Sequence, residues 1–101
     1  VKLRCIEGMN PSPISETDCP AWDKVASAVA GTWQGSLVSP YLMVQCSDSR
    51  HYGPVSNHVY RFSAMDLTAE ERSTIHGNNE RIRTEVIGRA VEFYIRLMSQ
   101  C

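Results

Sequence analysis

The sequence predicts an α/β fold, a partial layered sheet with two long helices, and three observations support this class. Two amphipathic stretches have helical spacing, short apolar runs lie before and between them, and proline, glycine or cap-type residues separate the segments. The chain has 101 residues, which is enough for one domain with one modest core.

The first predicted strand covers residues 1–6, in which apolar and polar side chains alternate, and Gly8 ends it. Two prolines at positions 11 and 13 then make an irregular connection. A helix follows, with Thr17 or Asp18 as its expected cap and Pro20 in its first turn. Its apolar stripe is Trp22, Val25, Ala26, Val29 and Trp33.

Two short apolar runs, residues 40–46 and 59–62, are expected to be buried strands of the sheet. Residues 66–72 are expected to form a polar loop or a single helical turn. From about Thr84 a second long amphipathic helix is predicted. Its apolar positions are Val86, Ile87, Ala90, Val91, Tyr94, Leu97 and Met98.

Three strands and two helices make a thin sheet for this chain length. Ordering each residue costs about 1.5 kcal/mol, which a small core can barely offset. The sheet is therefore expected to gain strands from chain that is not present, and the lack of an initial methionine fits a start inside a longer protein. Unpaired strand edges would then favour self-association into a homo-oligomer.

Composition excludes several classes of function. Hydrophobic residues make up 43%, charged residues 21%, and the net charge is −1, values typical of globular proteins. Neither nucleic acid nor an anionic membrane is an expected partner, because both need a basic surface. The four cysteines form no C-x-x-C pair, so a zinc ribbon is not expected. Four cysteines could form two disulfides in three different pairings, but four reduced thiols are favoured.

His76, in the stretch STIHGNNERI, is the first candidate for chemistry. Gly77 lets the backbone approach a ligand closely, and the two asparagines after it tolerate unusual dihedral angles. Glu80 can orient the ring or pair with Arg81. A lone loop histidine is by default structural, and zinc takes three or four protein ligands, so His76 alone makes no metal site.

The stretch QCSDSRHY is the second candidate, since Asp48, Ser49 and Arg50 follow a predicted strand. Ligands of α/β sheets bind at the carboxyl ends of strands. The planar guanidinium of Arg50 suits a substrate carboxylate. The alternatives are a helix N-cap formed by residues 47–49 and a surface ion pair for Arg50.

Taken in order, four motifs resemble the M20 zinc metallopeptidases, in particular the branch of Gly-Xaa carboxypeptidases and N-fatty-acyl-amino-acid hydrolases. The motifs are PSPIS at residues 11–15, PYL at 40–42 leading to SDSR at 47–50, VYRF at 59–62 and IHGNNERI at 75–82. SDSR is similar to the family's T-D-[ST]-R. The chain departs from the family at Ser47, where threonine is frequent, and at Cys46, where glycine is usual.

The resemblance implies a division of the chain. Residues 1–9 would be the last strand of a lid or dimerisation domain, and residues 10–101 the C-terminal part of a zinc-peptidase-like catalytic domain. In the family five residues hold two zinc ions, and the last of them, a histidine, matches His76. The other ligands, the bridging aspartate and the general-base glutamate would lie outside this chain, in the rest of the catalytic domain.

The implied function is hydrolysis of amide bonds in small peptides or N-acyl amino acids by the full-length protein. In this interpretation His76 is a metal ligand, and Glu80 is a local acceptor for its other ring N–H. Asp48, Ser49 and Arg50 belong to the substrate pocket, and the chain alone is inactive. The alternative is a non-catalytic interaction or dimerisation module that keeps the peptidase fold. A third is an independent small fold whose resemblance is accidental.

Overall fold

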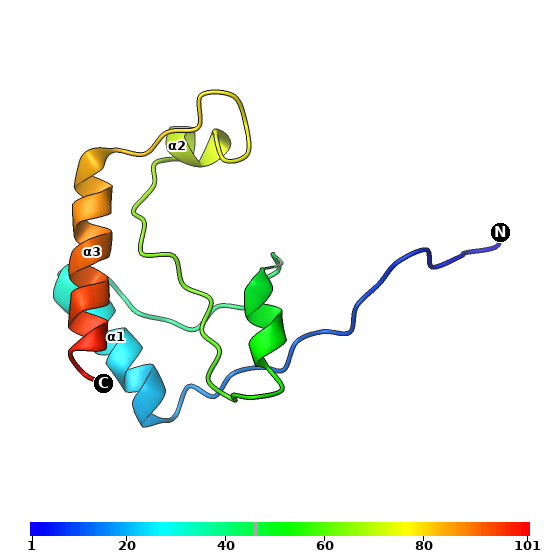
Figure 1. Ribbon diagram of the computed structural model, residues 1–101, viewed down its shortest axis with the longest axis horizontal. Helices are drawn as coiled ribbons and strands as arrows, with labels where there is room; N and C mark the ends of the chain where they lie inside the picture. Colours follow the sequence, from blue (N-terminus) through cyan, green and yellow to red (C-terminus); the bar gives the residue numbers. More distant parts are fainter. Residues whose placement is uncertain (46) are drawn as a thin grey trace.

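Helices supply all the regular secondary structure in the part of the chain that the structure, a computed structural model, describes, namely residues 1–45 and 47–101. The elements in chain order are helix α1 (Pro20–Thr32), the 3-10 helix η1 (Asp48–Tyr52), the short helix α2 (Ala69–Ser73) and helix α3 (Thr84–Met98). Long irregular connections join them (Figure 1).

The predicted α/β sheet is wrong, because no strand occurs in the described residues. Alternation of apolar side chains describes only one face of a segment, whereas a strand also needs a hydrogen-bonded partner along its backbone. The apolar runs lack such partners. The first two expose their side chains, as shown by Leu3 at 97% and Leu42 at 72%, whereas residues 59–61 are partly buried. Cys46, the last residue of the second predicted strand and the site of one departure from the family, lies outside the described residues.

Helix α1 starts where its sequence signal predicts, with Pro20 in the first turn. Proline fits there because the first N–H groups of a helix have no partner within it. The predicted cap is wrong: Cys19 occupies the N-cap position and its side chain makes no capping hydrogen bond. The helix closes with the backbone N–H of Trp33 donating to the carbonyl of Val29 at 2.8 Å.

Helix α3 also begins at the predicted residue, but its buried face differs from the predicted stripe. Val86 and Phe93 are buried, and Ala90 and Leu97 pack against the core. These four positions are separated by four, three and four residues and form one line along the helix. The remaining apolar positions predicted for the core are about half exposed: Ile87, Val91, Tyr94 and Met98.

The core lies where α1 packs beside α3 and the connection before α2 returns across them (Figure 1). Phe93 is 2% exposed and is the largest fully buried side chain. Its ring centroid lies 5.0 Å from that of Phe62 and 5.9 Å from that of Trp33. Such spacing is favourable for aromatic pairs. Phe93 therefore joins three segments that are far apart in sequence.

Side-chain hydrogen bonds attach the connection before α1 to the connection after η1. The Ser15 hydroxyl donates to the carbonyl of Val59 and accepts from its backbone N–H, both at 2.9 Å. The Tyr60 hydroxyl donates to the Glu16 carbonyl at 2.6 Å. The Ser15 hydroxyl thus bridges two segments that are 44 residues apart in sequence.

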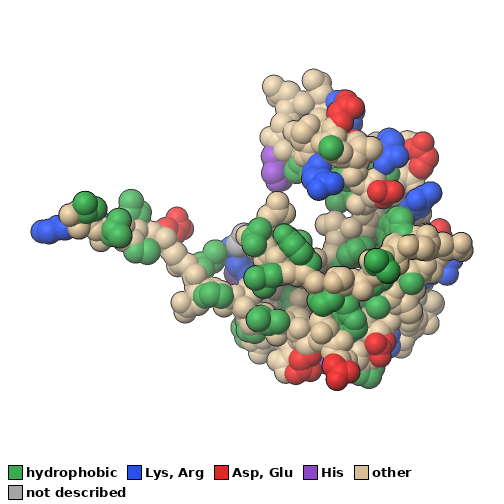
Figure 2. Space-filling view, turned by 180° about the vertical axis from the view of Figure 1, so that it is seen from behind, with side chains coloured by type: hydrophobic (Ala, Val, Ile, Leu, Met, Phe, Trp, Pro, Cys, Tyr) green, Lys and Arg blue, Asp and Glu red, His purple; other side chains and the backbone are tan. Residues whose placement is uncertain are grey.

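Residues 1–9 form an extended arm that reaches away from the helices and carries exposed hydrophobic side chains (Figures 1 and 2). Cys5, Cys19 and Cys101 are free thiols. None of the helices in the described part of the chain is both long enough and apolar enough to cross a membrane. The arm's assignment to a separate lid domain stays a prediction.

Replacing Phe93 with alanine should lower the free energy of unfolding by about 3–5 kcal/mol, the usual cost of truncating a buried phenylalanine. Ile95→Ala is the matched control on the same helix, because Ile95 is 59% exposed and should change stability by less than about 0.5 kcal/mol. Urea unfolding followed by circular dichroism measures both. Equal losses in the two variants would contradict the assigned core.

Candidate functional site

His76 lies in the connection between α2 and α3, residues 74–83, which we call the His76 loop. The backbone of His76 has a φ of 62°, and that of Asn79 has a φ of 60°. Both values fall in the left-handed region that residues with a side chain seldom adopt. Gly77 allows the turn to close tightly, because a Cβ at this position would lie only 3.2 Å from the carbonyl oxygen of Thr74. The His76 loop is thus a tight turn with two unfavourable backbone conformations.

The His76 side chain is exposed, and within the described chain nothing is hydrogen-bonded to its ring. Its backbone N–H donates to Oε2 of Glu80 at 3.3 Å. Glu80 therefore braces the loop through the main chain, and its predicted contact with the ring N–H stays a prediction. The imidazole is accessible to a ligand that arrives from outside.

A buried carboxylate connects α2 to the last residue of the His76 loop. Oε2 of Glu71 accepts from the backbone N–H of Thr68 at 2.8 Å, and the Thr68 hydroxyl accepts from the Glu71 N–H at 3.2 Å. This reciprocal pair is a capping box for α2. Oε1 accepts from the backbone N–H of Arg83 at 3.1 Å and from its Nε at 2.9 Å. Glu71 thus spans from the start of α2 to the start of α3.

The same contacts shift the pKa values of Glu71 and Arg83. The backbone N–H of Thr68 and then the Arg83 side chain lower the pKa of Glu71 to about 2, against an opposing effect of burial. The carboxylate in turn raises the pKa of Arg83. A second, exposed ion pair between Glu70 and Arg81 links the same two segments.

Asp48, Ser49 and Arg50 form the start of η1 rather than the end of a strand. Ser47 is the N-cap, and its hydroxyl accepts from the Ser49 backbone N–H at 3.3 Å. The helix N-cap that was the alternative interpretation of residues 47–49 is therefore present. Asp48 is exposed and Ser49 is partly buried.

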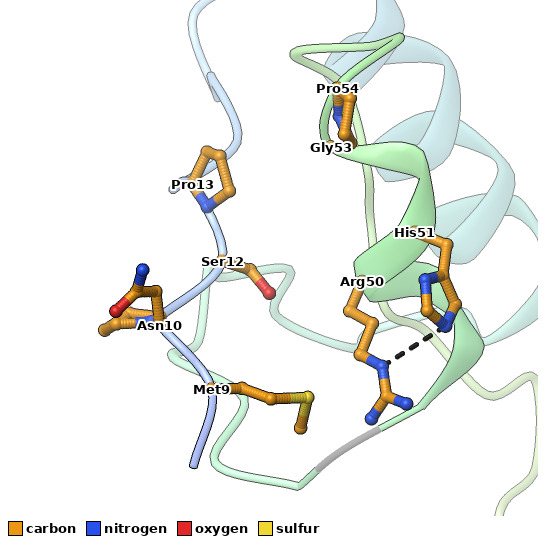
Figure 3. A pocket seen from close by; sticks show the side chains of 9 residues that line it. Met9, Asn10, Ser12, Pro13, Arg50, His51, Gly53 and Pro54 are labelled. Atoms are coloured by element: carbon orange, nitrogen blue, oxygen red, sulfur yellow. Dashed lines mark hydrogen bonds between the residues drawn. The ribbon is translucent and has the colours of Figure 1, made fainter.

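Arg50 borders a cleft of about 400 Å³ between η1 and residues 9–13. Figure 3 shows Met9 and Ser12 on one side of this cleft and Arg50 with His51 on the other. Nε of Arg50 donates to Nε2 of His51 at 3.3 Å. The predicted pocket residue Arg50 therefore lies at a cleft, and His51 and Ser12, which the sequence prediction omits, lie there with it.

The structure does not bring the two predicted parts of the site together. In Figure 1 the His76 loop (yellow) lies above η1 (green), and among the described helices packing is confined to α1 and α3, so η1 does not pack against α2. In the described ranges no group of three or more His, Cys, Asp or Glu side chains could hold a metal ion. Zinc takes three or four protein ligands, so the described residues alone do not make a complete zinc site.

Comparison with known proteins gives the family. An N-fatty-acyl-amino acid synthase/hydrolase of Xenopus tropicalis is 35% identical over 99 residues, covering 97% of this chain and 19% of the relative. A probable carboxypeptidase S-like protein of Dictyostelium discoideum is 27% identical with the same coverage. An uncharacterized carboxypeptidase of Schizosaccharomyces pombe is 30% identical over 91 residues, or 85% of this chain and 15% of the relative. The chain belongs to the M20 peptidase family.

The M20 assignment from the four sequence motifs is confirmed. Nearly the whole chain matches these relatives, but it spans only about a fifth of their length. No protein-family model and no solved structure matches it. The relatives are named as hydrolases and carboxypeptidases, which places the chain in a hydrolase family.

The low pKa of Glu71 predicts a pH dependence of stability. Its folded-state pKa of about 2 lies below the ordinary value of 4.5, so folding favours the ionised form. That stabilisation is complete above about pH 4.5 and is lost as the pH falls toward about 2. Glu71→Gln should therefore lose less stability than the wild type over this pH range in urea titrations.

Glu70→Gln is the control, because it removes the neighbouring carboxylate and leaves the Glu71 contacts intact. It should keep the steep acid dependence of the wild type. If Glu71→Gln is as steep as the wild type, the Glu71 contacts do not stabilise the fold.

Proposed function

We propose that this chain supplies one metal ligand, His76, and part of the substrate pocket to a longer M20-type amidohydrolase or peptidase. The substrates would be small peptides or N-acyl amino acids, the classes that the names of its relatives suggest. The observation that carries the proposal is the His76 imidazole itself: it is exposed, its ring has no partner in the described chain, and its loop is braced at both ends.

The chemistry of zinc agrees with this role. A bound zinc ion lowers the pKa of its water to around 7 and polarises a carbonyl oxygen, which is what amide hydrolysis needs. A neutral imidazole is a preferred ligand, and an exposed ring can offer one nitrogen without first breaking another contact. The remaining ligands of two ions, and the general base, would come from the rest of the protein. The chain alone should then be inactive.

Arg50 is the proposed anchor for a substrate carboxylate. Its guanidinium lies at the cleft beside residues 9–13, and its planar donors match a carboxylate in two parallel hydrogen bonds. Ser49 and Asp48 precede it in η1 but are not among the residues that line the cleft, and their place in the substrate pocket stays a prediction. Because η1 does not pack against α2, which leads into the His76 loop, the rest of the longer protein would have to complete a site that contains both the substrate pocket and the metal ligand.

Replacing His76 with asparagine in the complete protein tests the ligand assignment. Asparagine tolerates the left-handed backbone, so the variant removes the imidazole with little added strain. Loss of an acceptor outside the ligand set costs about 10–100-fold in metal affinity, so loss of a ligand should cost at least about 100-fold. Zinc content after dialysis against a chelator and the rate of amide hydrolysis measure the effect.

A zinc titration of the isolated 101-residue chain complements this test. Titration with Zn²⁺ in a calorimeter should show no submicromolar binding, because one imidazole cannot hold the ion. Tight binding by the isolated chain, or a His76→Asn protein that keeps its zinc, would contradict the proposal.

Arg50→Lys should raise KM by about 10- to 100-fold for substrates with a free carboxylate, because lysine keeps the charge but loses the paired hydrogen bonds. The value of kcat should change little. A substrate whose carboxylate is blocked as an amide is the control, and both proteins should hydrolyse it with similar KM. An equal effect on both substrates would show that Arg50 does not read the carboxylate.

A further inference from the structure

The carboxylate of Glu71 serves two elements at once. One oxygen binds the backbone of Thr68 at the start of α2, and the other binds the backbone and side chain of Arg83 at the start of α3. Nη2 of Arg83 also donates to the carbonyl of Asp66 at 2.7 Å. α2, which leads into the His76 loop, and Arg83, which ends the loop, are thereby held against each other by one group that is only 7% exposed.

Packing does little to hold the rest of the loop. Its two apolar side chains, Ile75 and Ile82, are both exposed, and the left-handed conformations of His76 and Asn79 each cost of order 1 kcal/mol. Such conformations persist when the surrounding contacts impose them. The contacts that close this loop are therefore polar, and the buried one among the described contacts belongs to Glu71.

We propose that Glu71 is a positioning residue for His76, fixing the two ends of the loop and thereby the direction in which the imidazole faces a metal ion. The inference rests on the proposed function of His76 as a ligand. Glu71 itself touches neither metal nor substrate. It acts by holding one conformation of the loop before the metal binds.

A simple capping role for Glu71 does not account for all of its contacts. The capping box with Thr68 serves only α2, a helix of five residues. The two hydrogen bonds from Arg83 cross the entire loop and contribute nothing to the N-terminus of α2. The two roles can be separated, because Thr68→Ala removes the hydroxyl of the capping box and leaves both Arg83 contacts in place.

Adjacent carboxylates provide a matched pair of variants. Glu70 and Glu71 are neighbours on α2, and each pairs with an arginine at the far end of the loop. The Glu70–Arg81 pair is exposed on both sides, and exposed ion pairs contribute between 0 and about 1 kcal/mol. In the Glu71–Arg83 pair the carboxylate is buried and the arginine is about half exposed, so the larger cost at Glu71 comes from the three hydrogen bonds that its oxygens accept. The same change, glutamate to glutamine, thus has different expected effects at the two positions.

The test uses the complete protein and measures its zinc dissociation constant by competition with a chelator. Glu71→Gln should weaken zinc binding by about 10- to 100-fold, the range for residues that orient a ligand. Glu70→Gln and Thr68→Ala should each stay within about 3-fold of the wild type. Substituting cobalt(II) for zinc adds a spectroscopic readout, since its visible absorption reports the ligand geometry, and only Glu71→Gln should change that spectrum.

Stability is measured alongside, so that unfolding is not mistaken for mispositioning. All variants are compared well below their melting temperatures, with circular dichroism as the check on folding. Should Glu71→Gln fail to fold, Arg83→Lys replaces it, because lysine keeps the charge and the backbone contact and loses the Nε contact. Arg83→Lys should weaken zinc binding by about 3- to 10-fold.

The outcomes separate the positioning inference from the proposed function. If His76→Asn loses zinc while a folded Glu71→Gln protein binds it like the wild type, the inference is wrong and the ligand assignment stands. If His76→Asn keeps its zinc, both are wrong. An equal loss in Thr68→Ala and Glu71→Gln would show that Glu71 acts as a helix cap and would also overturn the inference.

Discussion

The packing of Phe93 against Trp33 and Phe62 is the interaction on which the arrangement of the chain depends. It fixes α3 beside α1 and holds the connection that returns from η1 toward α2. Every functional statement about His76 follows from it, because α3 begins one residue after Arg83, and Arg83 closes the His76 loop. The core therefore sets the position of α3, and α3 sets one end of the loop.

Local signals predicted the helices well and the sheet badly. Pro20 and Thr84 mark helix starts through effects that act within a few residues, and both starts are correct. A strand depends on a partner elsewhere in the chain, which apolar alternation cannot supply. Phe93 was missed for a related reason: the apolar positions of α3 allow two overlapping stripes, and the choice between them is made by the aromatic rings of the other segments.

The candidate site was predictable in part. His76 could be singled out because glycine and asparagine follow it, and the left-handed dihedral angles of this loop agree with that composition. Thr68 and Glu71 have the spacing of a capping box, a visible signal that could have drawn attention to Glu71. Its partner Arg83 lies twelve residues away, and no local pattern indicates that contact. The family assignment came from motif order, which does not depend on how the segments fold.

The arm formed by residues 1–9 has a practical consequence for handling the protein. Its apolar side chains are exposed and take no part in the contacts around Phe93. A protease that cut just before Met9 would remove an extended segment with exposed apolar side chains. Helices α1 and α3 and the cleft beside Arg50 would stay intact. The exposed apolar side chains of the arm and the buried contacts of the core thus lie in different parts of the molecule.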